Sequence, residues 1–315
     1  IMKAGFIGYR HFAAKLYDLF KETGFVKQYI FYHPTKTLEG LDFTNDLNVL
    51  FDCDFIVVAS PDTTHVEYLR ELKGYKGYIF CEKIPAVDRE GLKFLKSYRN
   101  PRLYYNFNYR KSELCQLLEQ LSEEILHIDY KCGFGLALRP EYKLNWRSKA
   151  SNAFLGVFQL TGIHLFDLLL FCFGKPKYYR FTARNISPYG DSVDNFGINM
   201  EFANGVIAEL FLSYTSAYYN RIDIITSEKL ISWDNNEVIV KGPREIFDEK
   251  GLFKSPPVIS RKTADFYNDS LKSSVGYFIS AVKSKQSFSE ASSERNLLSN
   301  EIFLDILEDM KNKKK

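Results

Sequence analysis

The sequence predicts two domains, an α/β domain with a parallel sheet and an α+β domain with an open, mainly antiparallel sheet flanked by helices. Strand-like runs alternate with helical stretches over residues 1–115, as in parallel βαβ units. Short alternating runs follow a buried helix in residues 116–315 and favour the second kind of sheet. Helical spacing returns over about 263–311, and we expect these helices to pack back toward the first domain.

The chain opens with a predicted strand over 3–7, a tight turn over 8–12 and a helix over 13–22. Against the dinucleotide-binding (Rossmann) fingerprint, Gly8 takes the first glycine position and Ala13 the third. Arg10 stands at the second, where its charge is suited to face phosphates. We expect the turn to bind the cofactor through Gly8, Tyr9, Arg10, His11 and Phe12.

The second strand, over 26–32, ends without the acidic residue that would hydrogen-bond the ribose 2′-hydroxyl of NAD. The exit contains His33 and Lys36 instead, and a neutral to basic exit suits a 2′-phosphate better than a carboxylate would. The cofactor is therefore NADP or NAD, with a preference for NADP. A plain strand exit ended by Pro34 explains the same residues equally well.

A third strand over 54–59 leads into Ser60, Pro61 and a helix over 66–72. Ligands bind at the carboxyl ends of the strands in open parallel sheets, so we expect Ser60 and Pro61 beside the nicotinamide ribose. The same Ser-Pro-Asp run is also ordinary chemistry for the start of a helix.

A fourth strand over 77–81 is followed directly by the charged pair Glu82 and Lys83. A lysine held at that edge can be desolvated enough to donate a proton at neutral pH. The alternative is a solvated pair in a turn.

The stretch over 160–173 is apolar nearly all round and predicts a buried helix that carries His164. On an ideal α-helix Leu160 lies one turn before His164, Gln159 points about 100° away from Leu160, and Asp167 lies one turn after. His164 is either a site residue or a core histidine paired with Asp167, because buried polar groups need partners.

Six runs predict the second sheet, over 178–184, 197–202, 206–214, 221–226, 230–233 and 237–241. Ala203-Asn204-Gly205 is a hairpin signal, which favours an antiparallel or mixed sheet. The residues over 242–261, with three prolines, predict an irregular loop.

Composition excludes several classes of protein. The 315 residues carry a formal net charge of +3, which gives no support to a nucleic-acid partner. No run of about 18 apolar residues suggests a membrane span. The five cysteines are spread out without a Cys-x-x-Cys, which indicates neither a disulfide framework nor a metal site and favours the cytoplasm. Ile1 before Met2 is consistent with a cloning remnant.

Taken together, the ordered motifs resemble the Gfo/Idh/MocA family of sugar and cyclitol oxidoreductases. The resemblance spans most of the chain and includes 54–61 with His65 four residues on. It continues with Glu82-Lys83 in place of the family's Glu-Lys-Pro, where Pro85 comes one position late. The remaining matches lie in the runs over 107–110, 145–147 and 162–167.

The resemblance implies hydride transfer between a nicotinamide cofactor and a hydroxyl or keto carbon of a sugar, sugar nucleotide or cyclitol. It places Lys83 and His164 as catalytic residues and implies a homodimer or homotetramer that pairs through the C-terminal sheet. The predicted substrate-binding residues are Tyr109, Arg110, Trp146, Arg147, Gln159 and Asp167. His65, Glu82, Lys83 and Asn108 complete the predicted cofactor-binding set. Two alternatives remain, a cofactor-binding regulator on the same fold and an epimerase or lyase that uses transient oxidation.

Overall fold

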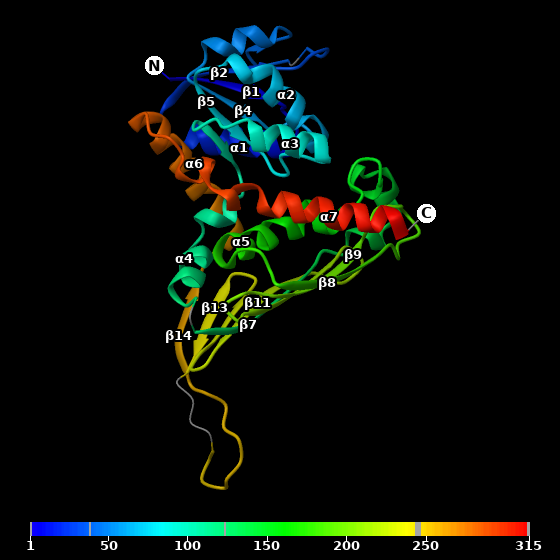
Figure 1. Ribbon diagram of the computed structural model, residues 1–315, viewed down its shortest axis with the longest axis vertical. Coiled ribbons are helices and arrows are strands. Elements are labelled where there is room, and N and C mark those ends of the chain that lie inside the picture. Colours follow the sequence, from blue (N-terminus) through cyan, green and yellow to red (C-terminus); the bar gives the residue numbers. More distant parts are fainter. Residues whose placement is uncertain (1, 38, 123, 243–246, 314–315) are drawn as a thin grey trace. The chain divides into compact units, whose positions relative to one another are not determined.

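The computed structural model describes residues 2–37, 39–122, 124–242 and 247–313 (Figure 1). The chain forms two compact units, one of Ile1–Lys111 with Ser270–Lys315 and one of Ser112–Asp269. The predicted boundary between residues 115 and 116 falls inside helix α4 (Glu113–Gln120). The units divide just before that helix because Ser112 starts it, accepting a hydrogen bond from the Cys115 amide at 3.1 Å.

The first unit is built on a six-stranded parallel sheet in the order β3-β2-β1-β4-β5-β6. Its strands are β1 (Met2–Ile7), β2 (Val26–Tyr32), β3 (Phe43–Thr44), β4 (Phe55–Val58), β5 (Tyr78–Cys81) and β6 (Leu103–Tyr105). Its helices are α1 (His11–Glu22), α2 (His65–Glu71), α3 (Arg89–Ser97), α6 (Phe266–Ser284, from Ser270 onward) and α7 (Leu298–Lys313). The βα alternation predicted for the first 115 residues is confirmed.

The two sides of this sheet are covered by different helices. The chain passes from β1 to β2 in one direction and from β4 to β5 to β6 in the other, so right-handed crossovers place α1 on one face and α2 and α3 on the other. Helix α6 shares the face of α1. Its Phe278 ring lies 6.0 Å from Phe20, 5.3 Å from Phe55 and 5.2 Å from Phe80, measured between centroids.

The second unit is an eight-stranded sheet in the order β14-β13-β12-β11-β7-β10-β9-β8, with α4 and α5 (Ile163–Phe173) as its longer complete helices. Its strands are β7 (Ile125–Gly133), β8 (Tyr178–Arg184), β9 (Asn195–Glu201), β10 (Ile207–Ser213), β11 (Tyr219–Thr226), β12 (Leu230–Asp234), β13 (Glu237–Lys241) and β14 (Val258–Thr263). The sheet is mixed, because β7 and β10 are parallel while the other pairs are antiparallel.

Two strands lie outside those predicted. Strand β7 is central, and it pairs with β10 and β11, which come far later in the chain. Strand β14 occupies the end of the stretch predicted as an irregular loop over 242–261, where β13 supplies the pairing groups. Residues 243–246 of that stretch lie outside the described part. The predicted hairpin is confirmed, since β9 and β10 are antiparallel and Gly205 has a φ of +90°.

One face of the second sheet forms the core of its unit. Inward residues of β9 and β10 alternate with exposed ones, as a half-buried sheet requires. Phe158, just before α5, stacks on Phe196 of β9 with ring centroids 4.1 Å apart. This packing holds the polypeptide that leads into α5 against the sheet.

Candidate functional site

The carboxyl ends of β1 and β4 mark the point where the strand order of the first sheet reverses, and a crevice forms at such a point in open α/β sheets. Gly8 follows β1 with a φ of +104°, and a Cβ atom there would lie 2.6 Å from the Ala59 carbonyl oxygen. Only glycine therefore fits the turn, and no side chain fills it. Helix α1 begins three residues later at His11, with its amino terminus at the same edge.

Basic side chains gather at the end of β2. The His33 ring lies 5.9 Å from the Tyr9 ring, and its Nδ1 atom accepts hydrogen bonds from the amides of Thr35 at 3.2 Å and Lys36 at 3.0 Å. Burial lowers the pKa of His33, and the charges of Lys36 and Arg10 lower it further. The structure thus brings Arg10, His33 and Lys36 together, with Arg10 and Lys36 exposed.

His65 connects two of the turns at this edge. The imidazole is 1% exposed, with Nδ1 2.9 Å from the Ile84 carbonyl oxygen and Nε2 2.9 Å from the Ser60 carbonyl oxygen. Burial lowers its pKa, so the neutral ring is the favoured form. These contacts make His65 a brace between the turns after β4 and β5. Cofactor binding by His65 stays a prediction.

Glu82 and Lys83 follow β5, and their environments differ. The Glu82 carboxylate is 5% exposed, whereas Lys83 is partly exposed. Asn106 donates to Glu82 Oε1 at 2.5 Å and accepts from the Ser274 hydroxyl of α6 at 2.6 Å. Burial raises the pKa of Glu82 to about 7, against the opposing effects of the Asn106 hydrogen bond and the Lys83 charge. Lys83 therefore sits beside a buried carboxyl group that titrates near neutrality.

Asn106 was missed by the sequence reasoning, although its place directly after β6 is the same signal that singled out Lys83 after β5. The predicted Asn108, two residues on, is fully buried and donates to the Ser270 hydroxyl at 2.6 Å. Both asparagines are thus held by serines of α6 within the first unit.

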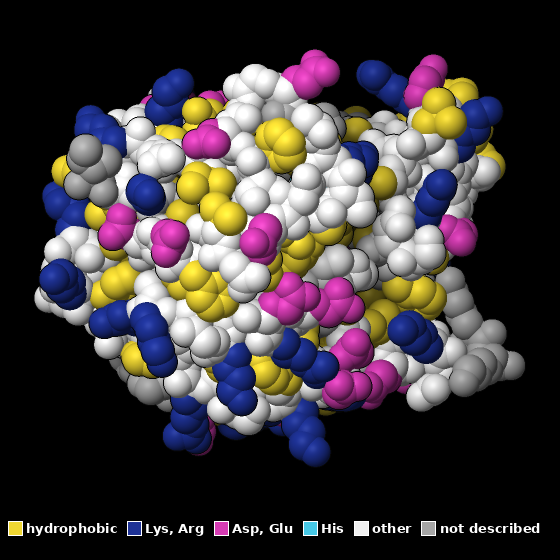
Figure 2. Space-filling view, turned by 90° about the horizontal axis from the view of Figure 1, so that it is seen from above, with side chains coloured by type: hydrophobic (Ala, Val, Ile, Leu, Met, Phe, Trp, Pro, Cys, Tyr) yellow, Lys and Arg dark blue, Asp and Glu magenta, His cyan; other side chains and the backbone are white. Residues whose placement is uncertain are grey.

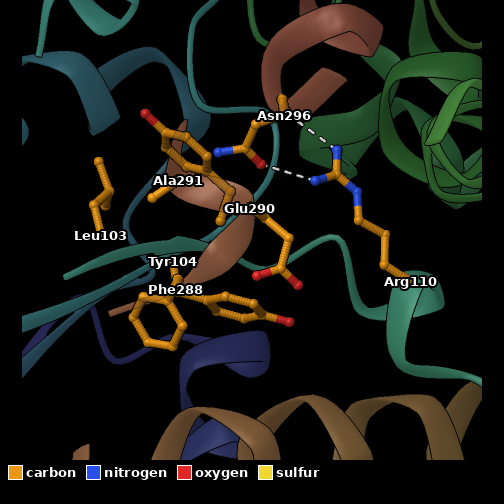
Figure 3. A pocket seen from close by; sticks show the side chains of 8 residues that line it. Leu103, Tyr104, Arg110, Phe288, Glu290, Ala291 and Asn296 are labelled. Atoms are coloured by element: carbon orange, nitrogen blue, oxygen red, sulfur yellow. Dashed lines mark hydrogen bonds between the residues drawn. The ribbon is translucent and has the colours of Figure 1, made fainter. Parts of the chain in front are cut away.

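Arg110 is buried in the first unit beside a cavity of about 10 Å³, which is near the smallest volume that can hold one water (Figure 3). Its guanidinium donates to the Asn296 side chain at 2.8 Å and to the Asn296 carbonyl at 3.1 Å, and it lies over the Phe107 ring. Glu290 lines the same cavity. These contacts tie Arg110 to the C-terminal segment of its own unit. Substrate binding by Tyr109, which is also buried, and by Arg110 stays a prediction.

The second unit contains His164, Asp167 and Gln159, all of them buried. His164 and Asp167 lie one turn apart on α5, and the Tyr267 ring of α6 is edge-on to the imidazole with centroids 6.3 Å apart. Lys83 belongs to the first unit and His164 to the second, and the structure describes each within its own unit.

Trp146 and Arg147 lie in a segment of short 3₁₀ turns, Pro140–Leu144 and Trp146–Ser148. The Arg147 guanidinium carbon is 4.7 Å from the centre of the Trp146 ring. The guanidinium also acts on the buried Tyr214 hydroxyl, whose pKa burial raises while a Thr161 hydrogen bond and Arg147 work to lower it. The Tyr214 and Thr161 hydroxyl oxygens are 3.3 Å apart. Arg147, Tyr214 and Thr161 thus form a polar cluster that reaches the polypeptide just before α5.

The helical geometry expected before His164 is wrong. Residues Phe158–Gly162 form a π-helical turn, in which the Ile163 amide donates to the Phe158 carbonyl five residues earlier. Gly162 permits this turn to lie against β10, since a Cβ atom there would be 2.1 Å from Leu212 Cδ1. Gln159 is 4% exposed, while Leu160 and Thr161 are partly exposed.

Within the described residues, no helix is long and apolar enough to cross a membrane. The same residues contain no group of three or more His, Cys, Asp or Glu side chains that could hold a metal ion. On one face of the molecule, Lys and Arg side chains are interspersed with Asp and Glu (Figure 2).

The fold and the turns at the carboxyl ends of β1, β2, β4 and β5 define a class, the proteins that pair a dinucleotide-binding α/β unit with a second unit built on a mixed sheet. Residues 124–232 match the GFO/IDH/MocA C-terminal domain. The chain thus carries the C-terminal domain of the Gfo/Idh/MocA family, which confirms the resemblance predicted from its sequence.

Individual proteins are more distant. Glucose-6-phosphate 3-dehydrogenase of Bacillus subtilis (strain 168) is 29% identical over 147 residues, which cover 44% of this chain and 42% of that protein. The match therefore spans less than half of the relative's length. An NAD-binding oxidoreductase from Klebsiella pneumoniae has the same fold, with a TM-score of 0.79 at 15% identity over 100% of this chain and 98% of that chain.

A second solved structure, levoglucosan dehydrogenase in complex with NADH and levoglucosan, has a TM-score of 0.75 at 18% identity. The match covers 95% of each chain. At these identities the likeness establishes the fold, including the predicted combination of a parallel sheet and a mainly antiparallel one.

Proposed function

We propose that this protein is an NAD(P)-dependent oxidoreductase that transfers hydride between the nicotinamide ring and a hydroxyl or keto carbon of a sugar, sugar nucleotide or cyclitol. The observation that carries the proposal is the edge of the parallel sheet, where the turn at Gly8, the turn at Ser60 and Lys83 follow β1, β4 and β5. The relative from Bacillus subtilis is named for sugar-phosphate dehydrogenation, and levoglucosan dehydrogenase holds NADH.

The residues at this edge fit a dinucleotide. A Cβ atom would close the turn at Gly8, and the amino terminus of α1 offers backbone amides to a pyrophosphate. Arg10, His33 and Lys36 would surround the ribose end, while Ser60 and Pro61 would border the nicotinamide end. The bound cofactor would supply a carbon that accepts or donates hydride.

Lys83 is the residue that we propose handles the proton. When a C–H bond of the substrate loses hydride, the hydroxyl on that carbon must lose its proton, and an uncharged Lys83 Nζ accepts it. In the reverse reaction the ammonium returns the proton to the carbonyl oxygen. We propose that His164 binds a substrate hydroxyl or shares this transfer.

Cofactor choice gives the first prediction. In fluorescence titrations we expect NADPH to bind more tightly than NADH, because Arg10 and Lys36 can pair with a 2′-phosphate. Lys36→Met should weaken NADPH binding about tenfold, the effect of losing one charge-assisted contact, and leave NADH unchanged.

Lys27→Met is the matched control, since Lys27 is an exposed lysine of the same strand. Tighter binding of NADH would overturn the NADP preference. Binding of neither nucleotide, with none copurifying, would favour a non-enzymatic member of the fold.

We also propose that the substrate carries an anionic group, a phosphate or a carboxylate, held by Arg147. In the part of the chain that the structure describes, no carboxylate forms an ion pair with this guanidinium, which rests on Trp146 and acts on Tyr214. A fixed, unneutralised guanidinium is suited to bidentate recognition of such a group.

Glucose 6-phosphate and glucose are the probe pair for this proposal. We expect glucose 6-phosphate to raise the unfolding midpoint more and to give the higher kcat/KM. Arg147→Met should lower kcat/KM for the phosphate about 10- to 100-fold, because it removes a charge-assisted contact and keeps the apolar stem. Lys143→Met, at an exposed lysine of the same segment, should change neither probe. An equal loss on both sugars would exclude recognition of the phosphate by Arg147.

The outward face of the second sheet supports the proposed homodimer or homotetramer. Exposed Tyr178, Ile207, Phe211 and Ile225 lie on four of its strands, and contiguous exposed apolar side chains mark association surfaces. The five unpaired thiols favour a reducing compartment, and we propose the cytoplasm.

A further inference from the structure

We infer that Gln159 is a positioning residue that fixes the orientation of the His164 imidazole across the π-helical turn. The inference rests on the proposed function in that it gives His164 a task in the reaction. Its geometry stands on the second unit alone.

The backbone provides the first step. The hydrogen bond from Ile163 to Phe158 adds one residue to the turn, so that the residue five before His164 takes the place that the residue four before it has in an α-helix. That residue is Gln159. An uninterrupted α-helix would put Leu160 there.

Burial provides the second step. Gln159 is 4% exposed and His164 is 6% exposed, whereas Leu160 is partly exposed. A glutamine buried among apolar residues while its leucine neighbour reaches solvent is the reverse of the usual order. The π turn accounts for it, because it turns Gln159 to the buried side that His164 also occupies.

Chemistry provides the third step. A buried primary amide must be hydrogen-bonded, and it can either accept from a ring N–H or donate to an unprotonated ring nitrogen. The partner of one imidazole nitrogen determines which tautomer is present and therefore what the other nitrogen offers to a substrate. The titratable neighbours of the ring include Asp167 on α5 and Tyr267 on α6.

The test compares Gln159→Leu, Gln159→Glu and Leu160→Asp by nitrogen-15 NMR of the histidine rings, with signals assigned through His164→Gln. We expect Gln159→Leu to move the His164 nitrogen signals toward the tautomer mixture of free imidazole. Gln159→Glu should raise the His164 pKa, because a carboxylate then faces the ring. Leu160→Asp should leave the ring signals in place, since that side chain points elsewhere.

Turnover supplies a second readout, in which Gln159→Leu should lower kcat at least tenfold with little change in KM and displace the pH profile. Unchanged His164 signals in Gln159→Leu would overturn the inference, as would a pKa increase from Leu160→Asp in place of Gln159→Glu. The NMR readout requires no substrate, so a protein that proves not to be a dehydrogenase would still decide the question. Gln159→Glu, with its matched shape, keeps the test decisive should Gln159→Leu fail to fold.

Discussion

Replacing Lys83 by methionine is expected to lower kcat/KM by about 10²- to 10⁴-fold, the usual contribution of a positioned general acid or base. Methionine keeps most of the apolar stem of Lys83 and removes only the group that can carry the proton. The Kd values for NADPH and NADH should change little, because the phosphate and ribose contacts proposed above involve other turns. Steady-state rates and fluorescence titrations measure the two quantities separately.

Lys73→Met is the matched control, since Lys73 is an exposed lysine in the turn that precedes β5. It should leave both quantities unchanged. Turnover that survives Lys83→Met would remove Lys83 from catalysis and favour a regulator that only binds the cofactor. Retained cofactor during turnover, with no net change in NAD(P)H, would instead favour an epimerase or lyase.

Replacing Glu82 by glutamine is expected to stabilise the protein at alkaline pH and to have little effect at acidic pH. Burial raises the pKa of Glu82 from 4.5 to about 7. A carboxyl group whose pKa is raised by folding contributes its full stability below the unfolded value and loses it as the pH rises through the folded value. The loss therefore falls between about pH 4.5 and pH 7.

Glutamine cannot ionise, and it keeps an oxygen that can accept from Asn106. Above pH 7 the free energy of unfolding of Glu82→Gln should exceed that of the native protein by up to about 3 kcal/mol, since each pKa unit corresponds to about 1.4 kcal/mol. Urea unfolding at pH 5, 6, 7 and 8 measures the difference. Glu22→Gln, at an exposed position that ends α1, should show none. A difference that does not vary with pH would mean that Glu82 ionises normally in the folded state.

The first sheet could be predicted from the sequence because its signals are local. Each strand is a short apolar run closed by a turn, and the site residues follow the strands directly, as Gly8, Ser60 and Lys83 do. Strand β2 begins and ends at the predicted residues, 26 and 32. Asn106 shows the limit of this reasoning, because only the structure reveals that it holds the carboxylate of Glu82.

The second unit was harder to predict because its organisation depends on long-range contacts. Strand β7 pairs with residues that follow it by eighty positions or more, and no local pattern indicates which run takes the centre of a sheet. The π turn escaped for a related reason. Gly162 must lie against Leu212 of β10, and that contact selects a turn which the apolar spacing of the segment does not reveal.

The first unit is assembled from the two ends of the chain, and this has a consequence for synthesis on the ribosome. Residues 112–269 emerge whole before α6 appears, so the second unit can fold while the parallel sheet still lacks Phe278 against Phe20 and Phe55. Until then the nascent chain presents an uncovered aromatic face, which is a site for chaperone capture or aggregation. Changes near the last fifty residues therefore act on the cofactor sheet that the first hundred residues begin.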